Sequence, residues 1–287
     1  MSARVVILGA SGFIGLAIMR ALSTDGSLEI ISHSSRTLDL TRPESVDALD
    51  AVAGPDTSLV FASALTPDRG QNLDTLGANL AMATNVARAL ERRPFGHVAY
   101  VGSDAVYGFD VNPVTETTPV APSGAYGFAK YAGEKIVEIA TGSKDIPLLI
   151  LRVAGVYGPG DPHGSYGPNS FARSIAKDRT LRMFGDGEEE RDHIFVDDVA
   201  GLAGALILAR ATGVFNVATG EARSFATVAR AMRDLVPYDV TVNSVPRKGA
   251  ITHRRYDTGR LQQAVPGFRF TPFNDGLRAT LQAFGAL

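Results

Sequence analysis

The sequence contains no cysteine and no tryptophan. Disulfides, thiolate metal sites and a cysteine nucleophile are therefore excluded. Its 28 Lys and Arg residues are balanced by 30 Asp and Glu residues, and no basic run stands out. The chain thus lacks the charge pattern of proteins that bind nucleic acid or an anionic membrane surface.

Long apolar stretches are missing as well. No segment reaches the roughly 18 apolar residues that a membrane-spanning helix needs. Met1 to Arg4 lead directly into a short apolar strand, with no charged leader or apolar signal segment. His163 and His193 stand alone, without the spacing of metal ligands. We expect a cytoplasmic protein with no metal site and with neither nucleic acid nor a membrane as partner.

Short apolar segments alternate with longer segments of helical period, which is typical of a parallel sheet with crossover helices. Strands are expected at Val5–Leu8, Leu28–Ile31, Leu59–Ala62, His97–Val101, Leu148–Arg152 and Val214–Val217. Helices are expected at Gly12–Leu22, Leu73–Leu90, Ala125–Ile139 and Val199–Ala209. Apolar residues follow one another in the strands without alternation, which indicates burial on both faces. The sequence predicts an α/β fold with a doubly wound parallel sheet of the Rossmann type.

A change in composition marks a smaller C-terminal lobe. Residues 157–170 read YGPGDPHGSYGPNS, in which seven of fourteen residues are Gly or Pro, and this segment is expected to be a long functional loop. We expect residues 1–155 to form the sheet domain, with 191–218 returning to it. Residues 156–190 and 219–287 are expected to form a substrate-binding lobe.

The segment VVILGASGFIG places Gly9, Gly12 and Gly15 between the first strand and the first helix, with Phe13 and Ile14 in the same turn. Glycines at such a turn let the backbone approach a pyrophosphate, and the helix N-terminus offers unpaired N–H donors. The pattern predicts that residues 1–155 bind a dinucleotide. The alternative is a turn whose small residues serve only packing.

The choice of dinucleotide is expected at the end of the second strand, where an acidic residue would bind a ribose hydroxyl. This chain has no carboxylate there and instead carries His33, Ser34, Ser35 and Arg36. Hydroxyls and a guanidinium suit a 2′-phosphate. NADP is therefore favoured over NAD, and the alternative is a polar loop with a solvated arginine.

The segment YGFAK puts Tyr126 and Lys130 four residues apart, on one face of the expected helix. A phenol with a pKa of about 10 is a poor base, and one cation about 4 Å away would lower that pKa to near 7. Tyr126 could then exchange a proton with a substrate oxygen while hydride moves at the same carbon. Ser103, after the fourth strand, could hydrogen-bond that oxygen. The alternative is a packed tyrosine beside a solvated lysine.

Five segments together resemble the extended short-chain dehydrogenases/reductases of the NAD-dependent epimerase/dehydratase family: GASGFIG, SDAVYG, YGFAK, RVAGVYGPG and FGDGEEERDHIFVDDVA. The resemblance covers nearly the whole chain in the family's order. It implies catalytic roles for Ser103, Tyr126 and Lys130, with Lys130 also holding the nicotinamide ribose. It implies further cofactor contacts at Asp39, Leu40, Ala62, Ala64 and Val156. Family members dimerise through the helices that correspond to Leu73–Leu90 and Ala125–Ile139, so a homodimer is expected.

Departures from the family pattern bear on the reaction. Dehydratases of the family have Thr-Asp-Glu where this chain has Ser103, Asp104 and Ala105, so the missing glutamate ranks a dehydratase below an epimerase or a reductase. Asp104 is a candidate substrate contact, or else a cap of local backbone N–H groups. Gly155 replaces an asparagine that is common in nucleotide-sugar enzymes, which leaves room for a substrate without a nucleotide.

Two further residues are candidate substrate contacts. Arg191 matches the arginine that nucleotide-sugar enzymes direct at the diphosphate, although the preceding run of three glutamates could pair with it. Asn169 follows the Gly/Pro-rich loop. The main hypothesis is an NAD(P)-dependent nucleotide-sugar epimerase or 4-keto-reductase. The alternatives are a reductase or dehydrogenase of a non-nucleotide carbonyl or sugar acid, and a non-catalytic dinucleotide-binding sensor.

Overall fold

A six-stranded parallel sheet forms the centre of the larger lobe, with the strand order β2-β1-β3-β4-β5-β9. The computed structural model describes residues 3–163, 167–247 and 249–287. The strands of this sheet are β1 (Arg4–Leu8), β2 (Glu29–His33), β3 (Thr57–Phe61), β4 (His97–Val101), β5 (Leu148–Val153) and β9 (Gly213–Val217). Each strand lies within two residues of its predicted bounds, and the predicted doubly wound α/β fold is confirmed.

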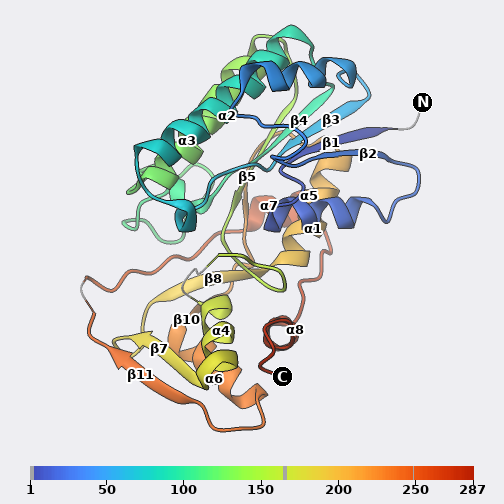
Figure 1. Cartoon of the computed structure of the whole chain (residues 1–287). Coiled ribbons are helices and arrows are strands. Elements are labelled where there is room, and N and C mark those ends of the chain that lie inside the picture. Colours follow the sequence, from blue (N-terminus) through green and yellow to red (C-terminus); the bar gives the residue numbers. More distant parts are fainter. Residues whose placement is uncertain (1–2, 164–166, 248) are drawn as a thin grey trace.

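Helices cover both faces of the sheet, as Figure 1 shows. They are α1 (Phe13–Leu22), α2 (Leu73–Arg92), α3 (Ala125–Gly142) and α5 (Val196–Leu208). Val5 and Ile7 of β1 belong to the core that α1 and α5 cover. Val6 and Leu8, the alternate residues, belong to the core under α2 and α3. Both side-chain rows of the strand are therefore buried, which explains the unbroken apolar runs in the sequence.

The order of the strands determines where a ligand can bind. From β1 the chain passes to β2 on one side and then crosses to β3 on the other side of β1. Ligands of open α/β sheets bind beyond the carboxyl ends of the strands at such a switch point. Three short 3-10 helices complete this lobe, namely η1 (Pro43–Ala51), η2 (Pro67–Arg69) and η3 (Asp104–Val106).

Helix α5 begins three residues earlier than predicted, at Val196. Asp197 and Asp198 therefore lie in its first turn, where they favour the helix dipole, and not in front of it. Asp198 does not cap the helix. Its carboxylate accepts hydrogen bonds from the Thr271 hydroxyl at 2.8 Å and from the Thr271 backbone N–H at 3.0 Å, which tie the C-terminal segment to α5.

The smaller lobe contains a three-stranded sheet in the order β10-β8-β6 and a β11-β7 pair. Its elements are β6 (Gly155–Tyr157), α4 (Pro168–Asp178), β7 (Thr180–Phe184), β8 (Glu190–Phe195), β10 (Ala222–Ser224), α6 (Phe225–Leu235), β11 (Thr241–Val245) and α8 (Phe273–Ala283). Phe171, Leu181, Phe225 and Leu277 pack together in its core. This lobe therefore has its own hydrophobic centre.

The C-terminal tail does not stay within one lobe. Tyr256 and Leu261 pack into the core of the larger lobe, and α7 (Gly259–Ala264) lies against β9 before α8 returns to the smaller lobe. The expected Gly/Pro-rich loop is also shorter than 157–170, because α4 begins at Pro168. Residues 164–166 of that loop lie outside the described residues. Within the described ranges, none of the helices combines the length and apolarity required to span a bilayer.

Candidate active site

A cleft of about 920 Å³ opens at the carboxyl ends of β1 and β3, next to the glycine turn. Gly9 has a φ of 86°, and a Cβ there would lie 2.7 Å from the Ser63 backbone nitrogen. A Cβ on Gly15 would lie 2.2 Å from the Gly9 carbonyl oxygen. Only glycine fits these two positions. The turn thus exposes its backbone to the cleft at the point where α1 begins.

The N-terminus of α1 suits an anionic group. Gly12 is the N-cap residue, and no side chain caps the first turn. The first N–H groups of a helix have no partner within the helix, and they carry the positive end of its dipole. A pyrophosphate over this turn would satisfy both, so the residues present fit a dinucleotide.

Most of the predicted cofactor residues line this cleft. They are Gly9, Gly12, Phe13, Ile14, Gly15, Ser35, Asp39, Leu40, Ala62, Ala64, Tyr126, Lys130 and Val156, and Ser103 joins them. These residues come from the turns after β1, β2, β3 and β4, from the start of α1, from α3 and from β6. The topology therefore collects segments that are far apart in the sequence.

Three residues predicted from the second strand do not line the cleft. His33 contributes its carbonyl oxygen, which accepts hydrogen bonds from Gly9 N at 2.9 Å and Ala10 N at 3.0 Å and so fixes the glycine turn. Ser34 uses its carbonyl oxygen in the next turn, for Leu38 N at 2.8 Å. Arg36 is exposed and pairs with no described residue. Of residues 33–36, only Ser35 lines the cleft.

Tyr126 and Lys130 extend from the start of α3 toward the end of β4. A Cβ on Gly127 would lie 2.2 Å from the Ala105 carbonyl oxygen, so glycine permits α3 to approach η3 this closely. The approach brings the Tyr126 phenol into a hydrogen bond with Ser103. Lys130 is buried, its ammonium donates to the Val101 carbonyl, and its Nζ lies 4.5 Å from the centre of the Tyr100 ring.

The ionisation of this group differs from the expectation. Burial raises the pKa of Tyr126 to about 12, an effect that the Ser103 hydrogen bond opposes and Asp104 reinforces. Burial also lowers the pKa of Lys130 to about 8. The prediction that Lys130 would bring the Tyr126 pKa near 7 is therefore wrong for the protein's own residues, because burial outweighs the cation. At neutral pH Tyr126 carries its proton.

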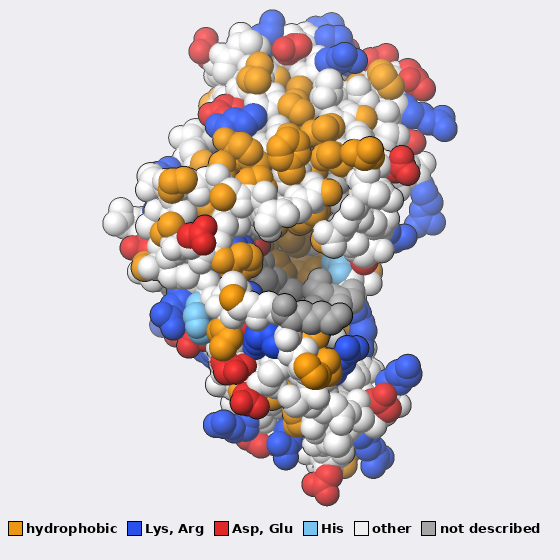
Figure 2. Space-filling view, turned by 90° about the vertical axis from the view of Figure 1, so that its left-hand side faces the viewer, with side chains coloured by type: hydrophobic (Ala, Val, Ile, Leu, Met, Phe, Trp, Pro, Cys, Tyr) orange, Lys and Arg blue, Asp and Glu red, His pale blue; other side chains and the backbone are white. Residues whose placement is uncertain are grey.

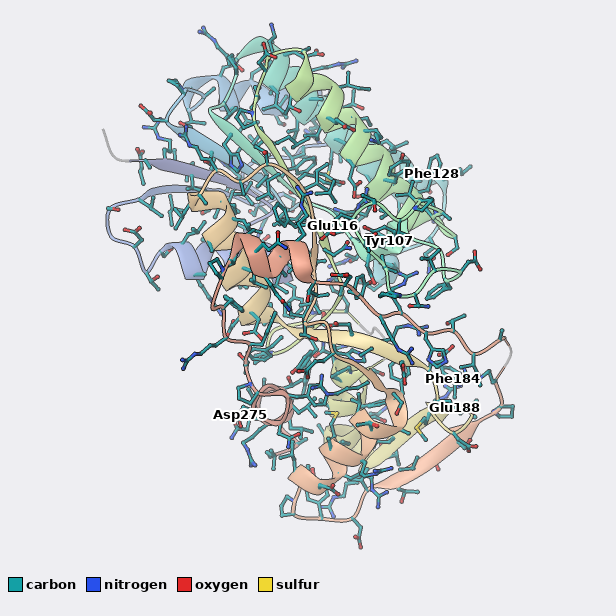
Figure 3. All side chains as sticks on the ribbon, turned by 180° about the vertical axis from the view of Figure 1, so that it is seen from behind. Tyr107, Glu116, Phe128, Phe184, Glu188 and Asp275 are labelled. Atoms are coloured by element: carbon teal, nitrogen blue, oxygen red, sulfur yellow. The ribbon has the colours of Figure 1, made fainter. Side chains whose placement is uncertain are left out.

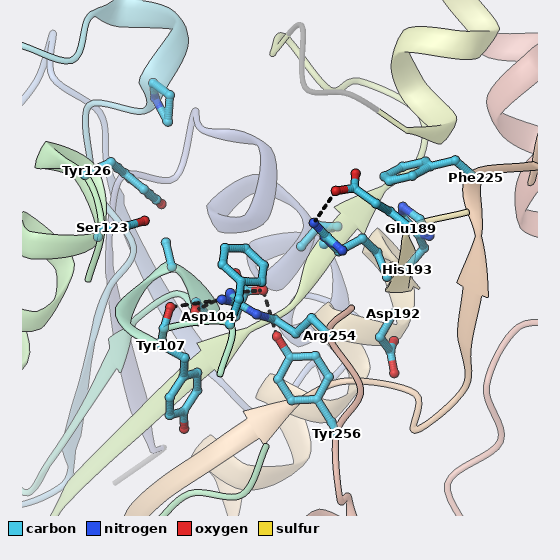
Figure 4. A pocket seen from close by; sticks show the side chains of 18 of the residues that line it. Asp104, Tyr107, Ser123, Tyr126, Glu189, Asp192, His193, Phe225, Arg254 and Tyr256 are labelled. Atoms are coloured by element: carbon cyan, nitrogen blue, oxygen red, sulfur yellow. Dashed lines mark hydrogen bonds and ion pairs between the residues drawn. The ribbon is translucent and has the colours of Figure 1, made fainter. Parts of the chain in front are cut away.

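A second pocket of about 510 Å³ lies beside the cleft, between the two lobes. Figure 2 shows the molecular surface hollowed between them. In Figure 4, Tyr126 and Ser123 stand on one side of this pocket, and Glu189, His193 and Phe225 stand on the other. Tyr126 lines both cavities, as do its neighbours Pro67, Asp104, Ala105 and Val156. The phenol of Tyr126 thus marks the junction of the two.

Asp104 makes long-range contacts and does not cap the local backbone. Its carboxylate accepts a hydrogen bond from the Tyr256 hydroxyl at 2.7 Å and pairs with Arg254 at 3.3 Å. Arg254 also donates to the carbonyl oxygens of Asp104, Tyr107 and Gly108. Asp104 therefore anchors the C-terminal tail at the wall of the pocket (Figure 4).

Arg191 lines the pocket, and hydrogen bonds hold its side chain in place. It donates to the Thr252 carbonyl and hydroxyl at 2.6 and 2.9 Å. The Phe109 ring lies between two guanidinium groups, with its centre 5.1 Å from Arg191 and 4.0 Å from Arg254. The Arg254 guanidinium already binds three carbonyl oxygens and the Asp104 carboxylate. Arg191 is therefore the better placed of the two arginines to bind an anionic ligand.

The three glutamates before Arg191 have different partners. Glu189 lines the pocket, 3.9 Å from Arg191 and 3.0 Å from Arg247. Glu188 pairs with Arg247 at 3.0 Å and lies away from the pocket, near Phe184 in the smaller lobe (Figure 3). Glu190 pairs with Arg255. One carboxylate of the run, that of Glu189, therefore lines the pocket together with Arg191.

Asn169 and the two histidines have structural contacts at the site. Asn169 is buried in the pocket wall, where it accepts from Gly158 N at 3.0 Å and donates to Asp161 at 2.8 Å. His193 lines the pocket, and burial lowers its pKa to about 3, so that it is neutral. His163 contacts Asp68 at 2.8 Å across the mouth of the cleft. Among the described residues no group of three or more His, Asp or Glu side chains is arranged to hold a metal ion.

Phe109, Glu189, Arg254 and Tyr256 are among the pocket residues that were not predicted from the sequence. The tail segment HRRYD, residues 253–257, could have indicated Arg254 and Tyr256, since it concentrates charge beside an aromatic residue. Its place opposite Asp104 depends on the tertiary fold, because about 150 residues separate the two segments, as the Arg254–Asp104 contact shows.

Comparison with known proteins agrees with this geometry. The model of the NAD dependent epimerase/dehydratase family matches residues 5–218. The chain belongs to this family. Among curated family members, a UDP-glucose 4-epimerase of Mycolicibacterium smegmatis is 28% identical over a 314-residue alignment, which covers 98% of each chain.

Solved structures show the same fold. A Thermus thermophilus UDP-glucose 4-epimerase, in complex with NAD, has a TM-score of 0.85 at 24% identity, with 98% of each chain covered. RMD from Pseudomonas aeruginosa, complexed with NADPH, has a TM-score of 0.87 at 23% identity, with 99% of each chain covered. The fold is thus shared with proteins crystallised with NAD and with NADPH.

Proposed function

We propose that this protein catalyses NAD(P)-dependent hydride transfer at a carbinol or ketone carbon of a sugar-type substrate. The observation that carries the proposal is the position of Tyr126, which lines both the dinucleotide cleft and the adjoining pocket. A group at that junction can reach a substrate oxygen while the cofactor lies on its other side. Family membership and the epimerase relatives support the same reaction class.

The residues of the cleft have distinct roles in this proposal. The glycine turn and the N-terminus of α1 would hold the pyrophosphate, and Lys130 would hold the nicotinamide ribose. When bound, the nicotinamide would accept or supply the hydride. Tyr126 would move a proton at the substrate oxygen, and Ser103 would hydrogen-bond the same oxygen. Because Tyr126 is protonated at neutral pH, the protein is ready to donate a proton to a carbonyl oxygen.

A nucleotide-sugar 4-epimerase or a 4-keto-reductase fits this site best. Ala105 lines both cavities at the position where a dehydratase would have a glutamate, so the site has no carboxylate there for elimination of water. Arg191 in the pocket wall would face the diphosphate, with Asn169 and Asp104 nearby. The relatives named above include UDP-glucose 4-epimerases, which supports a nucleotide sugar as substrate.

We expect Tyr126→Phe to lower kcat by about 100-fold or more, because the proton donor is removed while the ring remains. Dinucleotide affinity should stay within about twofold, as measured by thermal shift or NADPH fluorescence. Tyr131→Phe, in the same helix, is the matched control and should keep full activity. If Tyr126→Phe kept every activity of the wild type, the protein would be a dinucleotide sensor and the proposal would fail.

The proposal includes a preference for NADP over NAD. Ser35 lines the cleft, and Arg36 beside it has no described partner, so its guanidinium is free to bind a 2′-phosphate. Arg36→Ala should weaken NADPH binding by about 10-fold, the loss of one charge-assisted hydrogen bond, and leave NADH binding unchanged. Arg42→Ala, which removes a neighbouring arginine that pairs with Asp39, is the control. Equal affinity of the wild type for NADH and NADPH would reject the preference.

A substrate without a diphosphate is a second candidate, favoured by Glu189. A diphosphate at Arg191 would meet this carboxylate, which lies 3.9 Å from the guanidinium. Gly155 offers no side chain to such a ligand, and a Cβ there would lie 3.1 Å from the Asp192 carbonyl oxygen. An uncharged small carbonyl compound would avoid the repulsion from Glu189, and a sugar acid, with a single negative charge, would meet less of it than a diphosphate.

Binding of UDP, used as a probe, tests the effect of this charge. We expect Glu189→Gln to bind UDP about 10-fold more tightly than the wild type, because a negative charge leaves the pocket. Glu188→Gln also breaks a pair with Arg247 but lies outside the pocket, so it should bind UDP like the wild type. Calorimetry gives both affinities. Unchanged or weaker UDP binding by Glu189→Gln would show that Glu189 does not disfavour a diphosphate.

We also infer a homodimer through α2 and α3. Leu73, Phe128 and Ile139 of these helices are exposed, with 82%, 52% and 70% of their surface accessible. Figure 2 shows apolar side chains gathered on this face, and Phe128 projects from it in Figure 3. Sedimentation velocity should give a dimer that Ile139→Asp converts to a monomer. Leu208→Asp, on exposed α5 surface, should leave the dimer intact; a monomeric wild type would exclude this interface.

A further inference from the structure

The face of α3 that carries Tyr126 and Lys130 continues one turn further with Glu134. These three residues are four positions apart and share one face of the helix. Lys130 is 4% exposed and Glu134 is 1% exposed, so both charged groups are taken from water. A buried carboxylate at this position requires a partner, because burial of an unpaired charge is costly.

Arg152 of β5 holds the Glu134 carboxylate in a fixed orientation. Arg152 Nε lies 3.1 and 3.3 Å from the two carboxylate oxygens, and its Nη2 lies 2.8 Å from Oε2. Its Nη1 donates to the Tyr107 hydroxyl at 2.9 Å, and that hydroxyl donates to Asn216 at 2.8 Å. Contacts with Glu134 and with Tyr107 thus hold the Arg152 guanidinium in one orientation. Such a planar, bidentate pair fixes direction as well as charge.

The end of β4 is shaped around the same carboxylate. A Cβ on Gly102 would lie 3.0 Å from Glu134 Oε1, so glycine leaves room for the carboxylate beside the strand. The preceding residue, Val101, accepts the hydrogen bond of the Lys130 ammonium. Glu134 and Lys130 therefore approach successive residues of one strand end.

The charges of this region do not cancel. Lys130 and Arg152 are two buried cations, and the Glu134 carboxylate pairs with Arg152 and acts electrostatically to raise the pKa of Lys130. The other titratable groups around Lys130 are Tyr100 from β4, Tyr126 from α3 and Asp104 from η3. Burial acts to deprotonate Lys130, and Glu134 opposes it. Loss of Glu134 would remove the carboxylate that offsets the burial of the ammonium.

We propose that Glu134 is a positioning residue for hydride transfer: clamped by Arg152, its carboxylate keeps Lys130 charged and directed at the nicotinamide ribose beside Tyr126. The inference rests on the proposed function for the role of Lys130. In this view, residues of β5 and β4 support Tyr126 and Lys130 through their contacts with α3. Neither Glu134 nor Arg152 touches the reacting atoms.

The ionisation of Lys130 can be measured without a substrate. The chain has five lysines, Lys130, Lys135, Lys144, Lys177 and Lys248, so a full-length protein labelled with ¹³Cε-lysine gives a simple NMR titration. Lys130→Arg identifies the Lys130 resonance. In the wild type Lys130 should titrate at a pKa of about 8. In Glu134→Gln the midpoint should fall by about one pH unit or more.

Two variants separate this role from a merely structural one. Glu134→Asp keeps the charge and should restore most of the Lys130 midpoint, and it also serves if Glu134→Gln folds poorly. Glu138 lies one turn further along the helix, on exposed surface, and pairs with Lys135. Glu138→Gln is therefore the matched control. It should lower the midpoint of Lys135, whose pKa that pair raises, and leave Lys130 unchanged.

The second readout is the pH dependence of dinucleotide affinity between pH 6 and 10. Since the charged ammonium would bind the ribose, affinity should be lost as pH rises through the Lys130 midpoint, about one pH unit earlier in Glu134→Gln than in the wild type. An unmoved Lys130 midpoint in folded Glu134→Gln would overturn the inference. A moved midpoint with an unmoved affinity profile would overturn its link to the cofactor. If instead the wild type bound neither NADPH nor NADH, the proposed function itself would fail.

Discussion

The close approach of α3 to the end of β4 is the constraint on which the site depends. It requires glycine at two places on the helix: a Cβ on Gly127 would lie 2.2 Å from the Ala105 carbonyl oxygen, and one on Gly133 would lie 2.3 Å from the Tyr100 hydroxyl. The Tyr100 hydroxyl also donates to the Lys130 carbonyl. With the helix held there, Tyr126 meets Ser103 and the Lys130 ammonium meets the strand end.

Burial has two consequences at this contact. It keeps the proton on Tyr126, which suits donation to a carbonyl oxygen, and it weakens the hold of Lys130 on its own proton. A site that uses a charged lysine needs a compensating carboxylate, and Glu134 occupies that position under the clamp of Arg152. The proposed catalytic pair and the residues that support it thus form one electrostatic unit that spans α3, β4 and β5.

The pocket beside the cleft depends on contacts between the two lobes. Its walls come from segments of both lobes, joined where Asp104 holds Arg254 and Tyr256 of the C-terminal tail. Arg191 offers positive charge, and Glu189 partly offsets it. In our proposal, the balance between these two side chains decides how well the pocket accepts a diphosphate.

Local pattern was sufficient to predict the strands and long helices of the main sheet, because continuous apolar runs and the period of 3.6 residues report burial directly. The glycine turn, Ser103, Tyr126 and Lys130 were also evident, since their spacing carries the chemistry. Ionisation could not be predicted, because the pKa of Tyr126 follows from burial against η3 rather than from its spacing to Lys130. Nor could the partners of Asp104 and Glu134 be predicted. Arg254 lies 150 positions from Asp104, and Arg152 lies 18 positions from Glu134, so only the packing of the tail and of β5 against α3 brings these charges together.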